Sequence, residues 1–180
     1  MLRPLTGADA PALFAVFSDP RVMRYWSTPP WAEIEQARVF IERSADALAT
    51  GEALRLGLER RSDGQLIGQC TLFAFAEASC RAEIGYSLAA SAWGQGYMHE
   101  ALSALIDHGF DGLKLNRIEA DIDPRNAASA RSLERLGFTR EGLLRERWIV
   151  DDEVSDTALY GLLAREWRGR DKPVQRHTIG

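Results

Sequence analysis

The sequence predicts a single-domain mixed α/β fold, and three observations support this prediction. The chain has 180 residues, of which 46% are hydrophobic and 27% charged, a composition that supports one substantial core and excludes a disordered chain. The middle of the chain alternates apolar and polar residues over three consecutive segments, which is typical of an antiparallel meander. A strongly helical segment then lies between the third of these strands and another short strand, as in a strand–helix–strand crossover.

Two helices are expected before the meander. Residues 9–18 have helical apolar spacing, and Asp19-Pro20 ends that helix. Residues 20–31 are aromatic and are expected to be irregular. A second helix is predicted over residues 32–49. The face that we expect it to bury consists of Ile34, Ala37, Ile41, Ala45 and Leu48.

The meander is predicted from three segments, residues 53–61, 65–75 and 81–89, of which the first two are joined by a Ser-Asp-Gly turn. Successive side chains of a strand point to opposite faces. On the third strand, Glu83, Gly85 and Ser87 should therefore share one face, and Ile84, Tyr86 and Leu88 the other.

The second half of the chain continues this alternation of elements. We expect helices over residues 96–113 and 126–136, and strands over residues 117–122, 139–150 and 157–163. The helical apolar positions of the first of these helices are Leu102, Leu105, Ile106, Phe110 and Leu113. The acidic residues 151–153 form the turn between the last two strands. We expect the chain to be polar and frayed from Arg165 onward, and we assign the domain to residues 1–167 and a tail to residues 168–180.

Charge and composition exclude several classes of protein. The formal net charge of −4 argues against nonspecific nucleic-acid binding, and no apolar run is long enough to span a membrane. Because the N-terminus carries no apolar signal region, we expect a cytoplasmic protein with no DNA or membrane partner. Cys70 and Cys80 match no zinc pattern, and His99, His108 and His177 are not paired at ligand spacing, so no metal site is expected.

The most informative stretch is residues 92–101, which lies between a strand and a strong helix. Gly94 and Gly96 allow the backbone to turn tightly and to approach a ligand closely. The unpaired N–H groups and the positive dipole end of the following helix favour an anion, so this turn can cradle a pyrophosphate. The alternative is an ordinary strand-to-helix turn. The stretch lacks the Lys-Ser/Thr pair of a P-loop and the third glycine of a dinucleotide fingerprint.

A second informative stretch covers residues 123–138. Asn126 begins the predicted helix there, and its side chain either caps the helix or offers its amide to a ligand lying alongside.

The order of these two stretches along the chain resembles that in the GNAT superfamily of acyl-CoA-dependent N-acyltransferases. The likeness is greatest to its RimJ/RimL branch of ribosomal-protein N-terminal acetyltransferase-like enzymes. The likeness covers roughly residues 1–167. The matching pieces are Ala82–Tyr86, Trp93–Leu102, Asn126–Ser129, Leu136–Phe138, Glu141-Gly142, Asp156, Tyr160 and Glu166-Trp167. The phosphate loop of the superfamily usually begins with Gln or Arg and has Gly or Ala at its sixth position, where this chain has Trp93 and Met98.

The resemblance implies a mostly antiparallel seven-stranded sheet that is splayed at its middle and flanked by about four helices. It implies acetyl-CoA as co-substrate and no metal, and a homodimer is common in the branch. The coenzyme's pantetheine arm would pair with Tyr86, Ser87 and Leu88, and its pyrophosphate would bind Trp93, Gly94, Gln95, Gly96, Tyr97 and Met98. Asn126 would bond the same arm, and Arg131 and Arg135 would meet the nucleotide phosphate unless they are simply solvated.

Acetyl transfer from a thioester to an amine needs a base, an oxyanion donor and an acid for the thiolate. We assign the base to Glu83, acting directly or through water; its alternatives are a solvated glutamate or a salt bridge with Arg81. A backbone N–H within residues 86–88 would be the oxyanion donor. The resemblance implies Ser129 as the thiolate's proton donor. Tyr97 is either a second hydroxyl near the coenzyme or a packed aromatic residue.

The acceptor end is less specific. Tyr25, Trp26 and Trp31 either line an acceptor pocket or pack in the core or a lid. The acidic turn at residues 151–153 either attracts a cationic acceptor or is a solvated hairpin tip. We therefore expect an acetyl-CoA-dependent N-acetyltransferase acting on a protein α-amine or a small-molecule amine. The alternatives are transfer from a longer acyl-CoA, a non-catalytic CoA-binding or partner-binding module, and an RNA-associated factor, against which the net charge argues.

Overall fold

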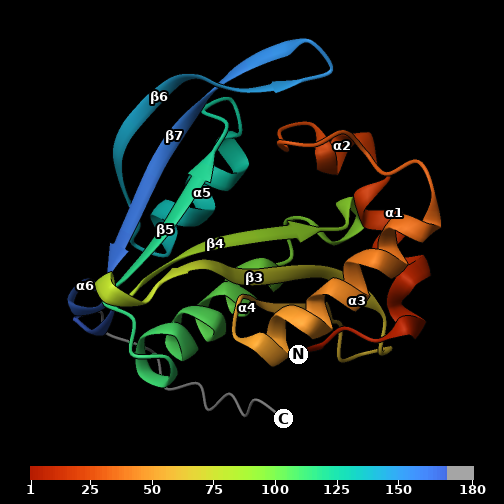
Figure 1. Ribbon diagram of the computed structural model, residues 1–180, viewed down its shortest axis with the longest axis horizontal. Helices are drawn as coiled ribbons and strands as arrows, with labels where there is room; N and C mark the ends of the chain where they lie inside the picture. Colours follow the sequence, from red (N-terminus) through yellow and green to blue (C-terminus); the bar gives the residue numbers. More distant parts are fainter. Residues whose placement is uncertain (170–180) are drawn as a thin grey trace.

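A seven-stranded sheet forms the centre of the computed structural model, which describes residues 1–169 (Figure 1). The strand order is β1-β2-β3-β4-β5-β7-β6. The strands are β1 (Leu2–Pro4), β2 (Leu54–Glu59), β3 (Leu66–Ala76), β4 (Arg81–Leu88), β5 (Arg117–Ile122), β6 (Thr139–Val150) and β7 (Glu153–Leu163). Neighbouring strands are antiparallel except β4 and β5, which are parallel and are joined by the predicted helical crossover.

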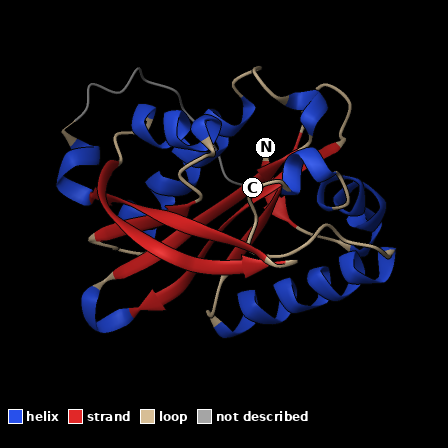
Figure 2. Cartoon of the chain, turned by 90° about the horizontal axis from the view of Figure 1, so that it is seen from above, coloured by secondary structure: helices blue, strands red, loops and turns tan. Residues whose placement is uncertain are grey.

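Helices lie on both sides of the sheet (Figure 2). The α-helices are α1 (Ala10–Phe17), α2 (Pro20–Met23), α3 (Ile34–Thr50), α4 (Tyr97–Asp107), α5 (Ala127–Arg135) and α6 (Ala164–Arg168), and a π-helical turn at His108–Gly112 extends α4. Apolar residues of α4 and α5 pack with the sheet in one buried cluster, and residues of α1 and α3 form a second cluster. Within residues 1–169, no helix combines the length and apolarity needed to cross a lipid bilayer.

The sheet is split between its two central strands. β4 and β5 pair only from Arg81 to Glu83 and from Arg117 to Glu119, after which the two strands diverge. The rest of β4, residues 84–88, has no strand on that side. Figure 1 shows β5, β6 and β7 leaning away from β3 and β4, starting from a vertex close to α6. The predicted splay of the sheet is thereby confirmed, and its backbone edges face each other across a gap.

Most predicted elements are confirmed, but four differ. The sequence pattern missed β1 and α2, which have only three and four residues, too few for a periodic signal. β7 begins at Glu153, earlier than the predicted residue 157. The additional residues at its start pair with β6 and not with β5. The prediction that the chain frays from Arg165 onward is wrong for the first residues of that segment. Trp167 of α6 is buried, and its Nε1–H donates to Asp107 at 2.7 Å. Residues 170–180 lie outside the described residues.

The buried face of α3 also differs from the prediction. Ala37 and Ile41 are buried as expected, whereas Ile34, Ala45 and Leu48 are exposed, Leu48 by 41%. The other buried positions of the helix are Ser44 and Ala47, so the buried stripe follows three-residue steps at its C-terminal end. Ser44 satisfies its hydroxyl locally by donating to the carbonyl oxygen of Phe40 at 2.6 Å, which allows a polar residue on a buried face.

The α4 region provides a test of the core by two leucine truncations. Leu102 is fully buried against the sheet, whereas Leu113, which has the same predicted periodicity, is 42% exposed. We expect Leu102→Ala to lower the free energy of unfolding by about 2–5 kcal/mol, because it leaves a cavity in the core. Leu113→Ala should change it by less than about 1 kcal/mol. Urea unfolding of both variants measures the difference, and equal losses would contradict the packing described.

Candidate functional site

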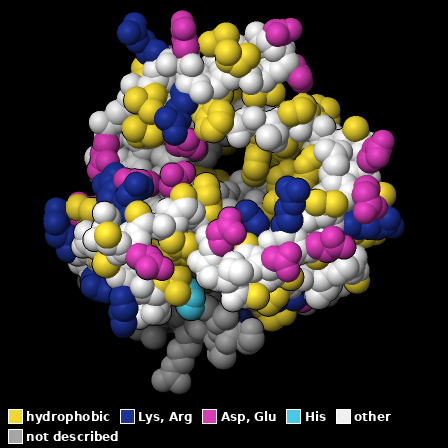
Figure 3. Space-filling model, in the orientation of Figure 1, with side chains coloured by type: hydrophobic (Ala, Val, Ile, Leu, Met, Phe, Trp, Pro, Cys, Tyr) yellow, Lys and Arg dark blue, Asp and Glu magenta, His cyan; other side chains and the backbone are white. Residues whose placement is uncertain are grey.

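A cavity of about 310 Å³ occupies the split between β4 and β5 and extends to the segment after α2. Figure 3 shows the hollow between the arm formed by β6 and β7 and the body of the molecule. The lining includes Tyr86, Asn126 and Ser129 at one end, Asp121 and Trp148 along the wall, and Tyr25, Trp26, Phe40, Arg55 and Gln69 at the other end. The cavity thus connects the α5 side of the split with the α1–α3 side.

Glu83 lies at the vertex of the split. It is the last residue of β4 that pairs with β5, where it is opposite Glu119. Arg81 and Arg117 both form ion pairs with Glu119, so the alternative salt bridge between Arg81 and Glu83 does not form. Within residues 1–169, the Glu83 side chain makes no hydrogen bond or ion pair, and it adjoins the cavity without lining it. Burial raises the pKa of Glu83 above its ordinary value, and the carboxylates of Asp121 and Glu119 raise it further.

Asp121 is a second carboxylate in the split, and sequence analysis did not identify it. It lines the cavity from β5, and Arg147 Nε of β6 lies 3.7 Å from its Oδ2. Burial raises the pKa of Asp121, while the charge of Arg147 opposes that rise. Parallel pairing brings β5 beside β4, so Asp121 and Glu83 lie in the same part of the split. Together the two carboxylates give this part of the split a local negative charge, next to the cavity.

A tyrosine and a serine meet across the other end of the split. The Tyr86 hydroxyl of β4 lies 2.6 Å from Ser129 Oγ of α5, and either atom can donate. Burial raises the pKa of Tyr86 to about 12, although its hydrogen bond with Ser129 opposes the shift. The phenol therefore keeps its proton at neutral pH. Asn126 caps α5, because its Oδ1 accepts the N–H of Ser129 at 3.1 Å; its amide N–H group is still available to a ligand in the cavity that it lines.

The glycine-containing turn before α4 has the conformation that its glycines were expected to allow. Gly94 and Gly96 have φ values of +73° and +83°, which L side chains rarely adopt. Gly96 is the N-cap of α4. Because glycine has no side chain to accept a hydrogen bond, the N–H groups in the first turn of the helix are not capped. Trp93 donates its Nε1–H to the carbonyl oxygen of Leu88 at 2.8 Å, and Gln95 bonds the carbonyl oxygen of Ser91. These side chains hold the turn and leave its backbone exposed.

The three aromatic residues of the predicted acceptor region lie in different environments. Tyr25 and Trp26 line the cavity. Trp31 does not line it: its ring stacks on Phe17 with a centroid distance of 4.4 Å, within the second buried cluster. For Trp31, the geometry therefore favours the alternative of core packing.

The acidic hairpin tip is tied to other residues rather than fully solvated. Glu153 pairs with Arg24 at 3.3 Å and with Arg125 at 2.6 Å, and these two arginines lie over the Tyr25 ring. Their hydrogen bonds lower the pKa of Glu153 below its ordinary value. Arg125 also pairs with the buried Asp123, whose pKa it lowers against the effect of burial. These contacts join the segment after α2 to β7 at the rim of the cavity.

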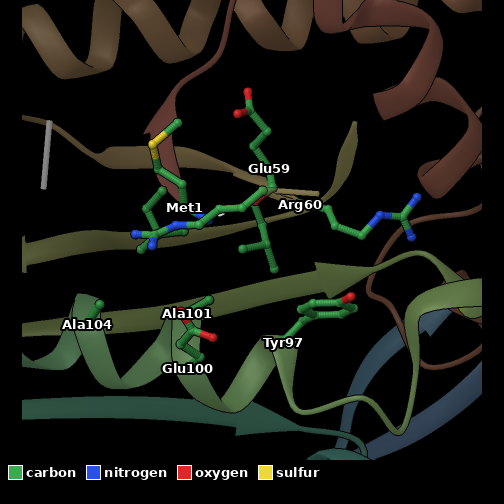
Figure 4. Close-up of a pocket in the computed structure, with 10 residues that line it drawn as sticks. Met1, Glu59, Arg60, Tyr97, Glu100, Ala101 and Ala104 are labelled. Carbon is green, nitrogen blue, oxygen red and sulfur yellow. Dashed lines mark hydrogen bonds between the residues drawn. The ribbon is translucent and has the colours of Figure 1, made fainter. Parts of the chain in front are cut away.

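Tyr97 lines a smaller cavity of about 140 Å³ between α4 and the strands β1 and β2 (Figure 4). Figure 4 shows the Tyr97 ring near Arg60, with Met1 and Glu59 in the same cavity. Tyr97 does not line the larger cavity, so its position favours the alternative of a packed aromatic residue.

The remaining predicted residues lie at the surface or on β4. Arg131 is exposed on α5, and Met98 is partly buried after the turn. Ser87 is buried, and its Oγ has no hydrogen-bond partner in the described part of the chain. Cys70 and Cys80 are both free thiols. No group of three or more His, Cys, Asp or Glu side chains in residues 1–169 is arranged to hold a metal ion.

A bulge in β6 carries one residue of the cavity wall and the arginine that pairs with another. The β6–β7 register shifts between Leu144 and Trp148, and Glu146 has a φ of +52°. The Asp156 side chain of β7 holds this bulge by accepting the Glu146 N–H at 2.8 Å. Because an irregular stretch changes the direction of the following side chains, the bulge places Arg147 beside Asp121 and Trp148 at the cavity.

The split sheet, with its glycine-containing turn before the crossover helix, can be compared with known proteins. The model of the acetyltransferase (GNAT) domain family matches residues 1–139. The chain belongs to this family, and it is an N-acetyltransferase.

Named relatives agree with this assignment. The N-acetyltransferase p20 of Bacillus licheniformis is 38% identical over 168 residues, which cover 93% of this chain and 94% of that protein. The [ribosomal protein uS5]-alanine N-acetyltransferase of Escherichia coli is 31% identical over 118 residues, 65% of this chain and 61% of the relative.

Solved structures show the same architecture. A GNAT-family acetyltransferase from Bacillus anthracis has a TM-score of 0.82 at 26% identity, with 92% of this chain and 95% of that chain covered. The spermidine N-acetyltransferase of Vibrio cholerae, solved in complex with CoA and spermine, also has a TM-score of 0.82, over 94% of this chain and 98% of that chain. At 21% identity, the latter likeness concerns the fold alone.

Asp156 allows the role of the bulge to be tested. Asp156→Ala removes the acceptor of the Glu146 N–H, and we expect it to lower the free energy of unfolding by about 0.5–1.5 kcal/mol and to raise the KM for an amine acceptor. Asp156→Asn keeps a carbonyl oxygen at the same position and should retain most of both properties. Urea unfolding and steady-state kinetics compare the two variants; identical behaviour of both would contradict the proposed role of this hydrogen bond.

Proposed function

We propose that this protein transfers an acetyl group from acetyl-CoA to a primary amine by direct attack within a ternary complex. The observation that carries the proposal is the split between β4 and β5, which leaves a β-strand edge exposed next to a partly buried carboxylate. When bound, acetyl-CoA supplies an activated thioester. The family membership and the RimJ/RimL-like resemblance support this reading.

The residues present fit the coenzyme in two places. Residues 84–88 of β4 have no strand partner on the β5 side, so their backbone groups can pair with the amides of a pantetheine arm. A backbone N–H of Tyr86–Leu88 can donate to the carbonyl oxygen of the acyl group. The uncapped first turn of α4, together with the exposed backbone of residues 93–98, presents N–H groups and a positive dipole end to a pyrophosphate.

Glu83 can take the proton of the acceptor amine, directly or through a water molecule. An alkyl ammonium has a pKa near ~10 and no free lone pair, so a base must remove its proton before attack. The raised pKa of Glu83 brings this carboxylate closer to the working pH than an ordinary glutamate. The absence of a side-chain partner for Glu83 in residues 1–169 leaves both of its oxygens available.

Ser129 can donate the proton that the leaving thiolate needs. Tyr86 stays protonated at neutral pH, so its hydroxyl can donate to Ser129 Oγ at 2.6 Å. The Ser129 hydroxyl hydrogen can then point into the cavity that both residues line. In this arrangement Tyr86 orients the proton donor, and as Ser129 passes its proton to the thiolate it takes another from Tyr86, which solvent water then reprotonates.

The acceptor enters at the α1–α3 side of the cavity, between Tyr25, Trp26 and the floor provided by β3. The name of the Escherichia coli relative, a [ribosomal protein uS5]-alanine N-acetyltransferase, points to a protein α-amine, which is a primary amine. Thiol release from acetyl-CoA in the presence of a panel of amines tests the proposal, and CoA binding with no release for any amine would contradict it.

Glu83→Gln tests the base. We expect kcat to fall by about 10²- to 10⁴-fold at neutral pH, with the Kd of acetyl-CoA nearly unchanged, because only the proton acceptor is lost. In the native enzyme, protonation of Glu83 should reduce kcat/KM on the acid side, at a pH above the ordinary glutamate value of 4.5. In the variant, the rate should instead follow deprotonation of the amine. An identical pH–rate profile in both proteins would remove Glu83 from the mechanism.

Gly96→Val tests the phosphate-binding turn. A β-branched side chain at this positive φ should shift the backbone N–H groups, and we expect CoA affinity to fall by about 10- to 100-fold in calorimetry. Gly51 also has a positive φ, +75°, but lies after α3. Gly51→Val therefore imposes a similar backbone strain away from the turn and should keep CoA affinity. Equal CoA affinity in both variants would count against the assignment of this turn.

A further inference from the structure

Arg55 is the only lysine or arginine among the described residues that line the large cavity. It lies on β2 directly opposite Thr71 of β3, which also lines the cavity. Its guanidinium carbon is 5.5 Å from the centroid of the Phe40 ring. None of the ion pairs formed within residues 1–169 includes Arg55.

A partly buried guanidinium over an aromatic ring is held in place but has unused hydrogen-bond donors. The planar guanidinium matches the geometry of a carboxylate or phosphate, with which it forms two parallel hydrogen bonds. Stacking on Phe40 restricts the Arg55 side chain and so reduces the entropy that it would lose on binding such a group. Arg55 therefore has the properties of a preorganised anion-binding residue.

Gln69 adds a second polar group on the same floor. It lies on β3 two residues before Thr71, so its side chain shares the face of Thr71, beside Arg55. Gln69 is only 2% exposed and lines the cavity, yet its Oε1 has no hydrogen-bond partner in the described part of the chain. An unpaired buried carbonyl oxygen costs about 1–3 kcal/mol, and only an N–H or O–H donor of a ligand bound beside it would recover this free energy.

The opposite end of the acceptor region carries negative charge. Glu83 lies there, as does Asp121, whose charge Arg147 partly offsets. Glu83 is two residues along β4 from Gly85, which is opposite Thr71. Standard strand spacings place the Cα atoms of Arg55 and Glu83 about 12 Å apart. The side chains of Arg55 and Glu83 extend into this space, so the distance between the guanidinium and the carboxylate is about the length of a small molecule. The cavity volume of about 310 Å³ is likewise in the range of small-molecule sites.

We propose that the acceptor is a small amine that also carries a carboxylate or phosphate group, and that Arg55 binds this anionic group while Gln69 Oε1 accepts a hydrogen bond from an N–H or O–H of the same molecule. This inference rests on the proposed acetyl transfer and names the substrate class of that site. The acceptor's amine lies toward Glu83 and Asp121, and its anionic group lies over the floor formed by β2 and β3. The opposite charges at the two ends orient the acceptor so that only its amine reaches the split.

Matched acceptors test the charge preference. Thiol release from acetyl-CoA is measured with a series of straight-chain ω-amino carboxylates, with O-phosphoethanolamine, with alkylamines of equal length, and with α,ω-diamines. For the native enzyme, we expect kcat/KM for the best anionic acceptor to exceed that for its neutral match by about 10- to 100-fold. The carboxylate and phosphate arms show which anion is preferred. A native enzyme that prefers the neutral amines or the diamines would overturn the proposal.

Substitution of Arg55 locates the preference. Arg55→Gln should remove the advantage of the anionic acceptors, mainly through KM, and leave kcat/KM for neutral alkylamines within about twofold of the native value. Arg55→Lys should keep part of the advantage, because a charge remains without the planar fork. Arg43→Gln is the matched control, since Arg43 is an exposed arginine of α3 that does not line the cavity.

The outcomes separate this inference from the proposed function. Equal loss for anionic and neutral acceptors in Arg55→Gln, or an unchanged preference in that variant, would overturn the role of Arg55. No thiol release with any acceptor, while CoA still binds, would instead contradict acetyl transfer itself. Thermal unfolding and CoA calorimetry on each variant confirm that it is folded, and the acceptor preference of the native enzyme decides the substrate class even if a variant does not fold.

Discussion

The short pairing between β4 and β5 is the constraint on which the rest of the structure depends. Parallel strands normally pair along their length, because unpaired backbone groups that are buried cost free energy. Here the pairing stops at Glu83 and Glu119, where Arg81 and Arg117 hold the vertex together through Glu119. Everything beyond that vertex is a gap with a strand edge on one side, and a ligand with amide groups can complete that edge.

Two separate clusters stabilise the fold. The helices α4 and α5 pack with the sheet in one cluster, and α1 and α3 form another. The first cluster contains residues of β4 and of β5, so it joins the two sides of the gap. At its rim, Glu153 links Arg24 and Arg125 across the opening, so that electrostatic contacts, rather than apolar packing, join the segment after α2 to β7. Such contacts are weak individually and can rearrange when a substrate enters.

Charge is distributed unevenly through the cavity, and this distribution favours one orientation of a bound acceptor. Glu119 pairs with two arginines, and burial raises the pKa values of the other two carboxylates near the vertex, Glu83 and Asp121. The guanidinium of Arg55 lies on the floor at the other end. A transferase that must aim one nitrogen at a thioester gains from such asymmetry, because a misoriented acceptor meets like charge.

The sequence by itself determined the order of the major helices and strands, the crossover and the turn at Gly94 and Gly96, since each of these depends on local periodicity or on backbone freedom at a single position. It also indicated Glu83 as a candidate base, whereas Ser129 was indicated only by the resemblance to the family. Only the tertiary structure decided which side chains meet. The contact of Tyr86 with Ser129, the nearness of Asp121 to Glu83 and the position of Arg55 in the cavity all arise from pairing between segments far apart in the chain. Local patterns do not encode strand order or register between distant segments, so no inspection of residues 117–122 alone could show that Asp121 faces the same gap as Glu83.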